Sequence, residues 1–168
     1  MAGTERPTDF PRPGPGQESV WHYPRPPKVE DSGRHVVVKL GDVVIAETRR
    51  ARRVCETSTP PCYYIPLEGI RTEYLHPIGR KTVCEWKGVA SYYDVRVGDR
   101  FVGAAAWTYK DPTPGYTSIT SYVAFYPHQL ECTIDGQRVR AQEGRIYGGW
   151  ITNEIVGPFK GAPGTENW

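Results

Sequence analysis

Apolar and polar side chains alternate with a period of two along several short segments of the chain. In residues 92–97, Tyr93, Val95 and Val97 share one face, whereas the two charged side chains point to the other. This alternation is typical of a β-strand that buries one of its faces. Strands also fit the short segments at residues 63–65, 105–109 and 121–125. No window shows a sustained helical period, so the pattern favours β-structure.

Two-residue turn signals join three pairs of predicted strands. Gly-Asp and Asp-Gly dipeptides supply the positive backbone φ angles that tight hairpins need. The three predicted hairpins span residues 35–46, 92–102 and 131–139. Because hairpins place neighbouring strands antiparallel, the sequence predicts an antiparallel all-β protein.

Length and composition agree with this fold class. The chain has 168 residues, enough for one domain with a substantial core. Its 20 aromatic residues bury large areas, and its 18 Gly and 16 Pro suit strands joined by turns.

We expect the proline-rich residues 1–16 to form an extended or disordered tail and residues 17–168 to form a single domain. Prolines among aromatics at residues 20–27 predict an extended segment lying across a sheet, and residues 157–164 predict an irregular C-terminal tail.

Net charge and hydropathy narrow the class of partner. A formal net charge of +2 gives no electrostatic basis for binding nucleic acid or an anionic membrane. No apolar run approaches membrane-spanning length, and the N-terminus lacks the apolar core of a signal peptide. We therefore expect a cytoplasmic protein with no nucleic-acid or membrane partner. The sequence leaves the oligomeric state open, including a homodimer.

The chain contains four cysteines, at positions 55, 62, 84 and 132. None forms a Cys-x-x-Cys pair, so neither a zinc knuckle nor a thioredoxin-like dithiol is indicated. Without a secretory signal a disulfide framework is not expected either, and we interpret the cysteines as reduced, mostly buried apolar residues. The sequence thus predicts no stoichiometric zinc and no bound cofactor.

The segment from Val83 to Tyr93 combines a thiol, an indole, an amine and a glycine at the approach to a strand. Gly88 allows the backbone to turn, so Trp86 and Lys87 leave the alternation of the strand. A buried ammonium is costly unless it is paired. Lys87 is therefore expected to pair with an acid such as Glu56, or to face a pocket that an anionic or polar ligand completes. The alternative is an amine in bulk solvent above a packed Trp86.

Cys84 and Lys87 are also the candidates for catalysis. A nearby ammonium lowers the pKa of a thiol toward reactivity. No histidine lies near them in the sequence to act as a base, so catalysis would require His76 or His128 to approach in three dimensions. The alternative interpretation is a buried thiol beside a solvated lysine.

An ordered series of motifs resembles the domain of unknown function 427 family, from about Val20 to the C-terminus. The runs that carry the resemblance are Glu56–Pro66, Cys84–Tyr93, Ala105–Tyr109, Tyr122–Pro127 and Gly148–Thr152. The resemblance implies a β-tent, in which two antiparallel sheets meet at an angle, as in methionine sulfoxide reductase B and the thalidomide-binding domain of cereblon. Many β-tent proteins hold zinc through two Cys-x-x-Cys pairs, which this chain lacks.

The family sometimes carries a nucleotidyltransferase label, which the residues do not support. Nucleotidyl transfer usually needs two carboxylates about two residues apart on one strand face, where they hold metal ions. No two acidic residues of this chain are so spaced, and there is no Gly-x-x-x-x-Gly-Lys-Ser/Thr loop. Arg50, Arg53 and Glu56 match family positions, where they either bind an anionic group or form a structural ion pair.

Three hypotheses follow. The first is a domain that binds a small polar or aromatic molecule in an aromatic-lined cleft between the two sheets. The second is an enzyme, either thiol-dependent through Cys84 or acting on a nucleotide, and the third is a scaffold that binds a protein through exposed aromatics. The expected ligand-binding residues are Arg50, Arg53, Glu56, Tyr64, Cys84, Trp86, Lys87, Tyr92, Trp107 and Tyr126.

Overall fold

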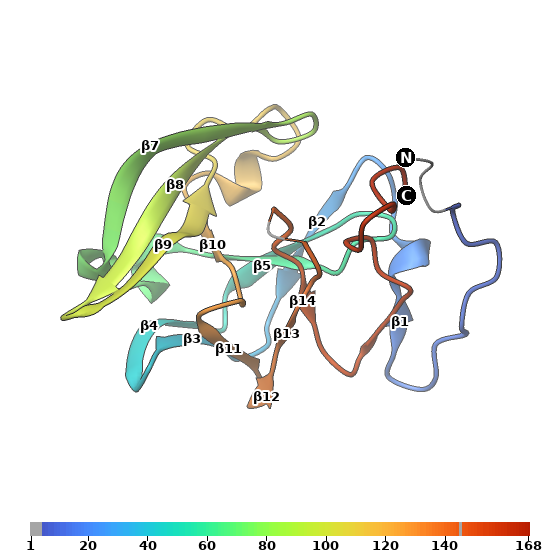
Figure 1. The fold of residues 1–168 in the computed structure, drawn as a ribbon, viewed down its shortest axis with the longest axis horizontal. Coiled ribbons are helices and arrows are strands. Elements are labelled where there is room, and N and C mark those ends of the chain that lie inside the picture. Colours follow the sequence, from blue (N-terminus) through green and yellow to red (C-terminus); the bar gives the residue numbers. More distant parts are fainter. Residues whose placement is uncertain (1–4, 145) are drawn as a thin grey trace.

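Two antiparallel sheets form the body of the protein in a computed structural model that describes residues 5–144 and 146–168 (Figure 1). The larger sheet has seven strands in the order β2-β5-β6-β10-β9-β8-β7, and the smaller sheet has four in the order β12-β11-β3-β4. Every strand pair within these two sheets is antiparallel. The prediction of an antiparallel all-β protein is therefore confirmed.

The strands are short except for those of two long hairpins. In chain order they are β1 (Glu18–Ser19), β2 (Lys28–Ser32), β3 (Val36–Leu40), β4 (Val43–Thr48), β5 (Ala51–Cys55), β6 (Cys62–Ile65), β7 (Leu75–Cys84), β8 (Gly88–Val97), β9 (Arg100–Thr108), β10 (Val123–Phe125), β11 (Glu131–Ile134), β12 (Gln137–Arg138), β13 (Arg140–Ala141), β14 (Trp150–Ile151) and β15 (Ile155–Val156). Four short 3-10 helices join them: η1 (Val20–His22), η2 (Leu67–Gly69), η3 (Thr72–Tyr74) and η4 (Thr117–Ile119). No helix among the described residues is long and apolar enough to cross a membrane.

All three predicted hairpins are present, as β3–β4, β8–β9 and β11–β12. The glycine of each turn has a positive φ, as the turn requires. The strand predicted at residues 105–109 is present through Thr108, but it continues β9 instead of standing apart from the β8–β9 hairpin. A register shift between β8 and β9 and a positive φ at Ala104 interrupt the alternation there, which divides one strand into two in the sequence pattern.

The first hydrophobic cluster fills the space between the two sheets. Val36 and Ile45 of the smaller sheet belong to it together with Ile65, Val95 and Phe125 of the larger sheet, and each of them is fully buried. Tyr93 and Val97 pack against the same cluster, so the shared face predicted for them and Val95 is confirmed. The two sheets therefore meet through an apolar core.

A second cluster covers the other face of the larger sheet. It contains Tyr64, Tyr92, Trp107 and Tyr109, whose sequence neighbours Tyr63, Tyr93 and Ala106 face the first cluster. Consecutive side chains along a strand point to opposite faces of the sheet, so both faces of these central strands carry apolar side chains. This outer face carries the aromatic residues that the sequence singled out.

A third cluster joins the two ends of the chain. Trp21 of η1 and Trp168 have ring centroids 5.8 Å apart, and Phe10 stacks on Trp21 at 4.5 Å. β1 pairs in parallel with β15, and Figure 1 shows this blue N-terminal part beside the red C-terminal part. Residues 20–22 form a 3-10 turn rather than the predicted extended segment, and Trp21 and Tyr23 belong to this cluster together with Cys55 of β5. Residues 5–17 contain no strand or helix, and residues 1–4 of the predicted tail lie outside the described part.

Candidate functional site

The β7–β8 turn places the thiol and the amine that the sequence singled out. Cys84 ends β7 and Gly88 begins β8 with a φ of 102°, a conformation that favours glycine. Thr113 fixes the turn from a neighbouring loop: its hydroxyl donates to the carbonyl of Trp86, and its amide donates to the carbonyl of Lys87 at 3.1 Å. The turn therefore holds Lys87 in one direction.

A row of cross-strand partners forms the floor of the site. Tyr64 pairs with Ala124, Ala124 with Trp107, and Trp107 with Tyr92, across β6, β10, β9 and β8. Directly opposite partners share a face of the sheet, so the three aromatic rings project to the same side. Because Ala124 fills little space between them, the rings of Tyr64 and Trp107 meet edge to face at 6.2 Å.

A cavity of about 390 Å³ lies over this floor, and we call it the aromatic cleft. Besides the row of strand residues it is lined by Tyr109 and Tyr126, and by loop residues between Gln142 and Lys160. No residue of the smaller sheet lines it. The predicted position between the two sheets is therefore wrong: the first hydrophobic cluster fills that space, and the cleft lies on the opposite face of the larger sheet.

The walls of the aromatic cleft are rings in mutual contact. Trp107 and Tyr126 have ring centroids 4.5 Å apart, and the indole nitrogen of Trp107 donates to the hydroxyl of Tyr64 at 3.3 Å. The hydroxyl of Tyr92 shares a hydrogen bond of 2.9 Å with Thr82 of β7. These contacts fix the rings before any ligand arrives, as in preformed small-molecule sites.

Three cations line the aromatic cleft, and each lies over a tyrosine ring. The distances from cation to ring centroid are 5.7 Å for Lys87 over Tyr109, 4.8 Å for Arg80 over Tyr92 and 5.9 Å for Lys160 over Tyr147. None of the three forms an ion pair with a described Asp or Glu side chain. The cleft therefore contains positive charge that the protein does not neutralise by direct pairing.

Glu56 is the single carboxylate among the described residues that line the aromatic cleft. One of its oxygens already pairs with Arg25, at 3.4 Å. Burial by itself lowers the pKa of Lys87, but Tyr109, Cys84, Cys62 and Glu56 together outweigh burial and raise that pKa above its ordinary value. Lys87 is thus an ammonium at neutral pH, near Glu56 but not in an ion pair with it.

Two thiols, Cys62 and Cys84, also line the aromatic cleft. All four cysteines are free, and Cys55 and Cys132 are buried while Cys62 and Cys84 are half-buried. Burial raises the pKa of Cys62 to about 11, so this side chain is a neutral thiol at physiological pH. Neither cleft thiol has a histidine beside it: none of the four histidines lines the cleft, and His76 lies on β7 opposite Asp94.

Seven of the ten predicted site residues line the aromatic cleft together. They are Glu56, Tyr64, Cys84, Lys87, Tyr92, Trp107 and Tyr126. Trp86 does not, because its ring packs against the second hydrophobic cluster, where its indole nitrogen is buried without a hydrogen-bond partner. Arg50 does not, because it lies in the turn before β5 and lines a separate surface depression with Arg52 and Tyr122.

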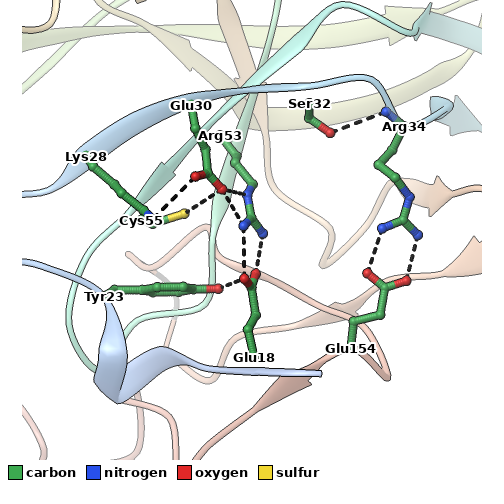
Figure 2. Close-up of polar contacts among 9 residues, drawn as sticks. All are labelled: Glu18, Tyr23, Lys28, Glu30, Ser32, Arg34, Arg53, Cys55 and Glu154. Atoms are coloured by element: carbon green, nitrogen blue, oxygen red, sulfur yellow. Dashed lines mark hydrogen bonds and ion pairs between the residues drawn. The ribbon is translucent and has the colours of Figure 1, made fainter. Parts of the chain in front are cut away.

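Arg53 is the third predicted residue that lies elsewhere, in a polar cluster near the chain ends (Figure 2). Its guanidinium pairs with Glu18 of β1 at 2.5 Å and with Glu30 of β2, and the hydroxyl of Tyr23 donates to Glu18 at 2.8 Å. Two carboxylates already occupy the guanidinium, so Arg53 forms the structural ion pair that the sequence left as one of two alternatives. The nearby Arg34 holds Glu154 with two bonds of 2.6 Å.

The sequence did not identify several lining residues, among them Cys62, Arg80, Tyr109, Gln142, Tyr147 and Lys160. Cys62 and Tyr109 could have been found from the family motifs that contain them. Gln142, Tyr147 and Lys160 lie outside those motifs, and their place over the sheet depends on long-range contacts. The side chain of Gln142 makes two such contacts: it accepts a hydrogen bond from the amide of Gly149 at 3.0 Å and donates one to the carbonyl of Lys160 at 2.7 Å.

The remaining alternatives find less support in this geometry. Among the described residues, no group of three or more His, Cys, Asp or Glu side chains is placed to hold a metal ion. Within the described part of the chain, the large exposed apolar side chains are Leu67, Val83, Val89, Phe101 and Ile146. Only one of these is aromatic, so a scaffold that binds through exposed aromatics has little surface available.

Fold and site together define a class of protein: an antiparallel all-β domain with a cation-bearing aromatic cleft on the outer face of its larger sheet. The chain belongs to the family described as domain of unknown function DUF427, whose family model matches residues 28–136. This span contains the strand residues of the cleft, whereas the loop residues between Gln142 and Lys160 lie beyond it. A comparison with curated proteins finds no match.

Proposed function

We propose that the protein binds a small planar anion in the aromatic cleft, with Lys87 as the charged anchor. The observation that carries the proposal is a partly buried ammonium that lines an aromatic cavity without an ion pair to any described acid. Desolvating an ammonium is costly, and its contact with the face of Tyr109 offsets only part of that cost. An anionic ligand would supply the missing countercharge.

The rings determine the shape of the ligand in this proposal. The aromatic side chains of Tyr64, Tyr92, Trp107 and Tyr126 line a cavity of about 390 Å³. This volume lies within the usual range for small-molecule sites, roughly 300–1,000 Å³. An aromatic or heteroaromatic ring gains stacking contacts on such walls that a saturated ring does not.

Three matched probes test charge and planarity separately. Isothermal titration calorimetry would compare 2-naphthoate with its neutral amide, 2-naphthamide, and with the saturated decahydro-2-naphthoate. We expect 2-naphthoate to bind about ten-fold more tightly than the amide, since a charge-assisted contact is worth more than a neutral one. Comparable binding of all three probes, or no binding of 2-naphthoate, would contradict the proposal.

A matched pair of variants assigns the binding to the cleft. Lys87→Met removes the ammonium and keeps most of the side-chain volume, and it should reduce the preference for 2-naphthoate over the amide to less than about two-fold. Lys39→Met makes the same change on β3 of the smaller sheet, away from the cleft, and should leave the preference intact. Loss of the preference in both variants would show attraction to the general positive charge of the protein instead.

We also propose that the protein functions in the cytoplasm. All four cysteines are free, as expected for a reducing compartment. Cell fractionation checks this directly, and recovery of the protein in an oxidising compartment would contradict it.

A further inference from the structure

A second cavity, of about 470 Å³, opens beside the aromatic cleft, and we call it the outer cavity. Three side chains line both cavities: Arg80, Tyr92 and Tyr126. Gly103, Ala104 and Ala105 of β9 form part of its lining. Because these residues carry at most a methyl group, no large side chain fills the space above the strand.

The polar groups of the outer cavity favour an anion. Arg80, His128 and Gln129 line it, and no Asp or Glu does. The guanidinium of Arg80 lies over Tyr92 without an ion pair to a described acid, so its donors are available to a ligand. His128 and Gln129 are exposed at the surface and add two side chains that can donate hydrogen bonds.

Tyr126 stands at the boundary between the two cavities. Its ring lies 4.5 Å from that of Trp107 in the aromatic cleft and 6.0 Å from that of His128 in the outer cavity. A ligand group in one cavity and a ligand group in the other would therefore contact the same tyrosine. Arg80 is shared in the same way, so the two cavities form adjoining parts of one surface.

We propose that the ligand has two parts: a planar ring with one anionic group in the aromatic cleft, and a second anionic group of phosphate size in the outer cavity, bound by Arg80 and His128. This inference rests on the proposed function and extends it to a class of ligand, an aromatic acid that also carries a phosphate. A guanidinium fork matches two phosphate oxygens, which favours phosphate over a neutral group in this position.

The test compares 6-hydroxy-2-naphthoate with its phosphate monoester and with an analogue that carries the phosphate on a two-carbon linker. Calorimetric titration at constant ionic strength should show that at least one phosphate-bearing probe binds about 10- to 100-fold more tightly than the parent hydroxy acid. His128→Ala should reduce this gain, measured as the ratio of the two affinities within the same variant, to less than about three-fold, because His128 lines the outer cavity.

His76→Ala is the matched control, since His76 is an exposed histidine that lines neither cavity. It should preserve the phosphate gain. If the hydroxy acid binds through Lys87 but neither phosphate probe gains affinity, the two-part ligand is overturned and the proposed function stands. If the phosphate probes bind tightly in Lys87→Met, the outer cavity acts alone and the two-part ligand is again overturned. If no naphthoate binds, both proposals are overturned together.

Discussion

At the scale of single residues, the aromatic cleft holds its cations against rings rather than against carboxylates. Lys87 over Tyr109 and Arg80 over Tyr92 are fixed in direction without losing their charge to a permanent partner. A cation over an aromatic face gains about 0.5–2 kcal/mol, less than a buried ion pair would cost to break. A ligand can therefore recruit these charges without displacing an acid of the protein.

Ser58 illustrates a residue whose own environment is unfavourable. It is fully buried, its φ is 72°, and its hydroxyl has no hydrogen-bond partner. Ser58→Gly removes both the left-handed strain and the unsatisfied hydroxyl, so we expect the free energy of unfolding to rise by about 1 kcal/mol. Urea denaturation monitored by tryptophan fluorescence measures the change.

Ser58→Ala separates the two contributions. It removes the hydroxyl and retains a side chain at positive φ, so the gain should be smaller than for glycine. A glycine variant less stable than the parent protein would show that the contacts of the Ser58 side chain outweigh its strain and its unsatisfied hydroxyl.

At the scale of elements, the segment that closes the aromatic cleft depends on close backbone approach. A Cβ atom at Gly148 would overlap the indole ring of Trp107, and one at Gly149 would lie 2.8 Å from the carbonyl oxygen of Pro60. The segment therefore rests directly on the floor of the cleft. The buried Gln142 joins it to Lys160, so both sides of the closing loop are fixed by one side chain.

Gly148→Ala should move this segment away from Trp107. We expect a loss of about 1–3 kcal/mol in the free energy of unfolding and weaker binding of 2-naphthoate, because an inserted methyl group has no space to enter. Gly79→Ala in β7 is the control: no atom lies within 4 Å of the added Cβ atom, and its φ is not positive. Equal losses in the two variants, by calorimetric titration and thermal denaturation, would refute the role of the contact.

The elements also show how far sequence reasoning extends. Hairpins β3–β4 and β8–β9 were predictable because a two-residue turn fixes the pairing locally. β7 was not, because Pro77 and Gly79 lie within it and most of its side chains are exposed. β7 is an edge strand with no neighbour on one side, so a proline that lacks an amide hydrogen breaks no hydrogen-bond ladder there. The sequence indicated which kinds of side chain form the cleft. Which of them share one face depends on the pairing register of the strands and on the loops, and no local sequence pattern determines either.

At the scale of the whole molecule, ion pairs attach the N-terminal segment to the sheets (Figure 2). Arg53 of β5 joins Glu18 of β1 to Glu30 of β2, and Arg34 joins Glu154 to Asp135. Burial raises the pKa of Glu18, but hydrogen bonds from Arg53 and Tyr23 outweigh it and bring that pKa below its ordinary value. The hydrogen bonds from Arg34 likewise lower the pKa of Glu154 below its ordinary value.

These shifts predict a loss of stability in acid. A carboxyl group with a lowered pKa in the folded protein contributes stability above its unfolded pKa and loses it as the pH falls through the folded value. The free energy of unfolding should therefore be constant from neutral pH to about pH 5 and then fall as the pH decreases below about 4.5. Urea denaturation between pH 7 and pH 3 measures this profile.

Arg53→Met tests the assignment of this dependence. It leaves two carboxylates without their partner, so stability at pH 7 should fall by about 2–4 kcal/mol and the decline in acid should become shallower. Arg138→Met, which removes an exposed pair with Glu131, should cost less than about 1 kcal/mol and keep the profile. If Arg53→Met left the pH dependence of the free energy of unfolding unchanged, the groups that titrate would not be the partners of Arg53.

The parallel pairing of β1 with β15 also determines when the protein can be completed during synthesis. Glu18 lies opposite Ile155, so strand β1 has no partner until residues 155 and 156 have left the ribosome. The β7–β8 and β8–β9 hairpins are local and can pair much earlier, whereas a contact between distant residues waits for both. Lys160 reaches the cleft only in that last stage, so a nascent or truncated chain would hold folded sheets around an unfinished binding surface.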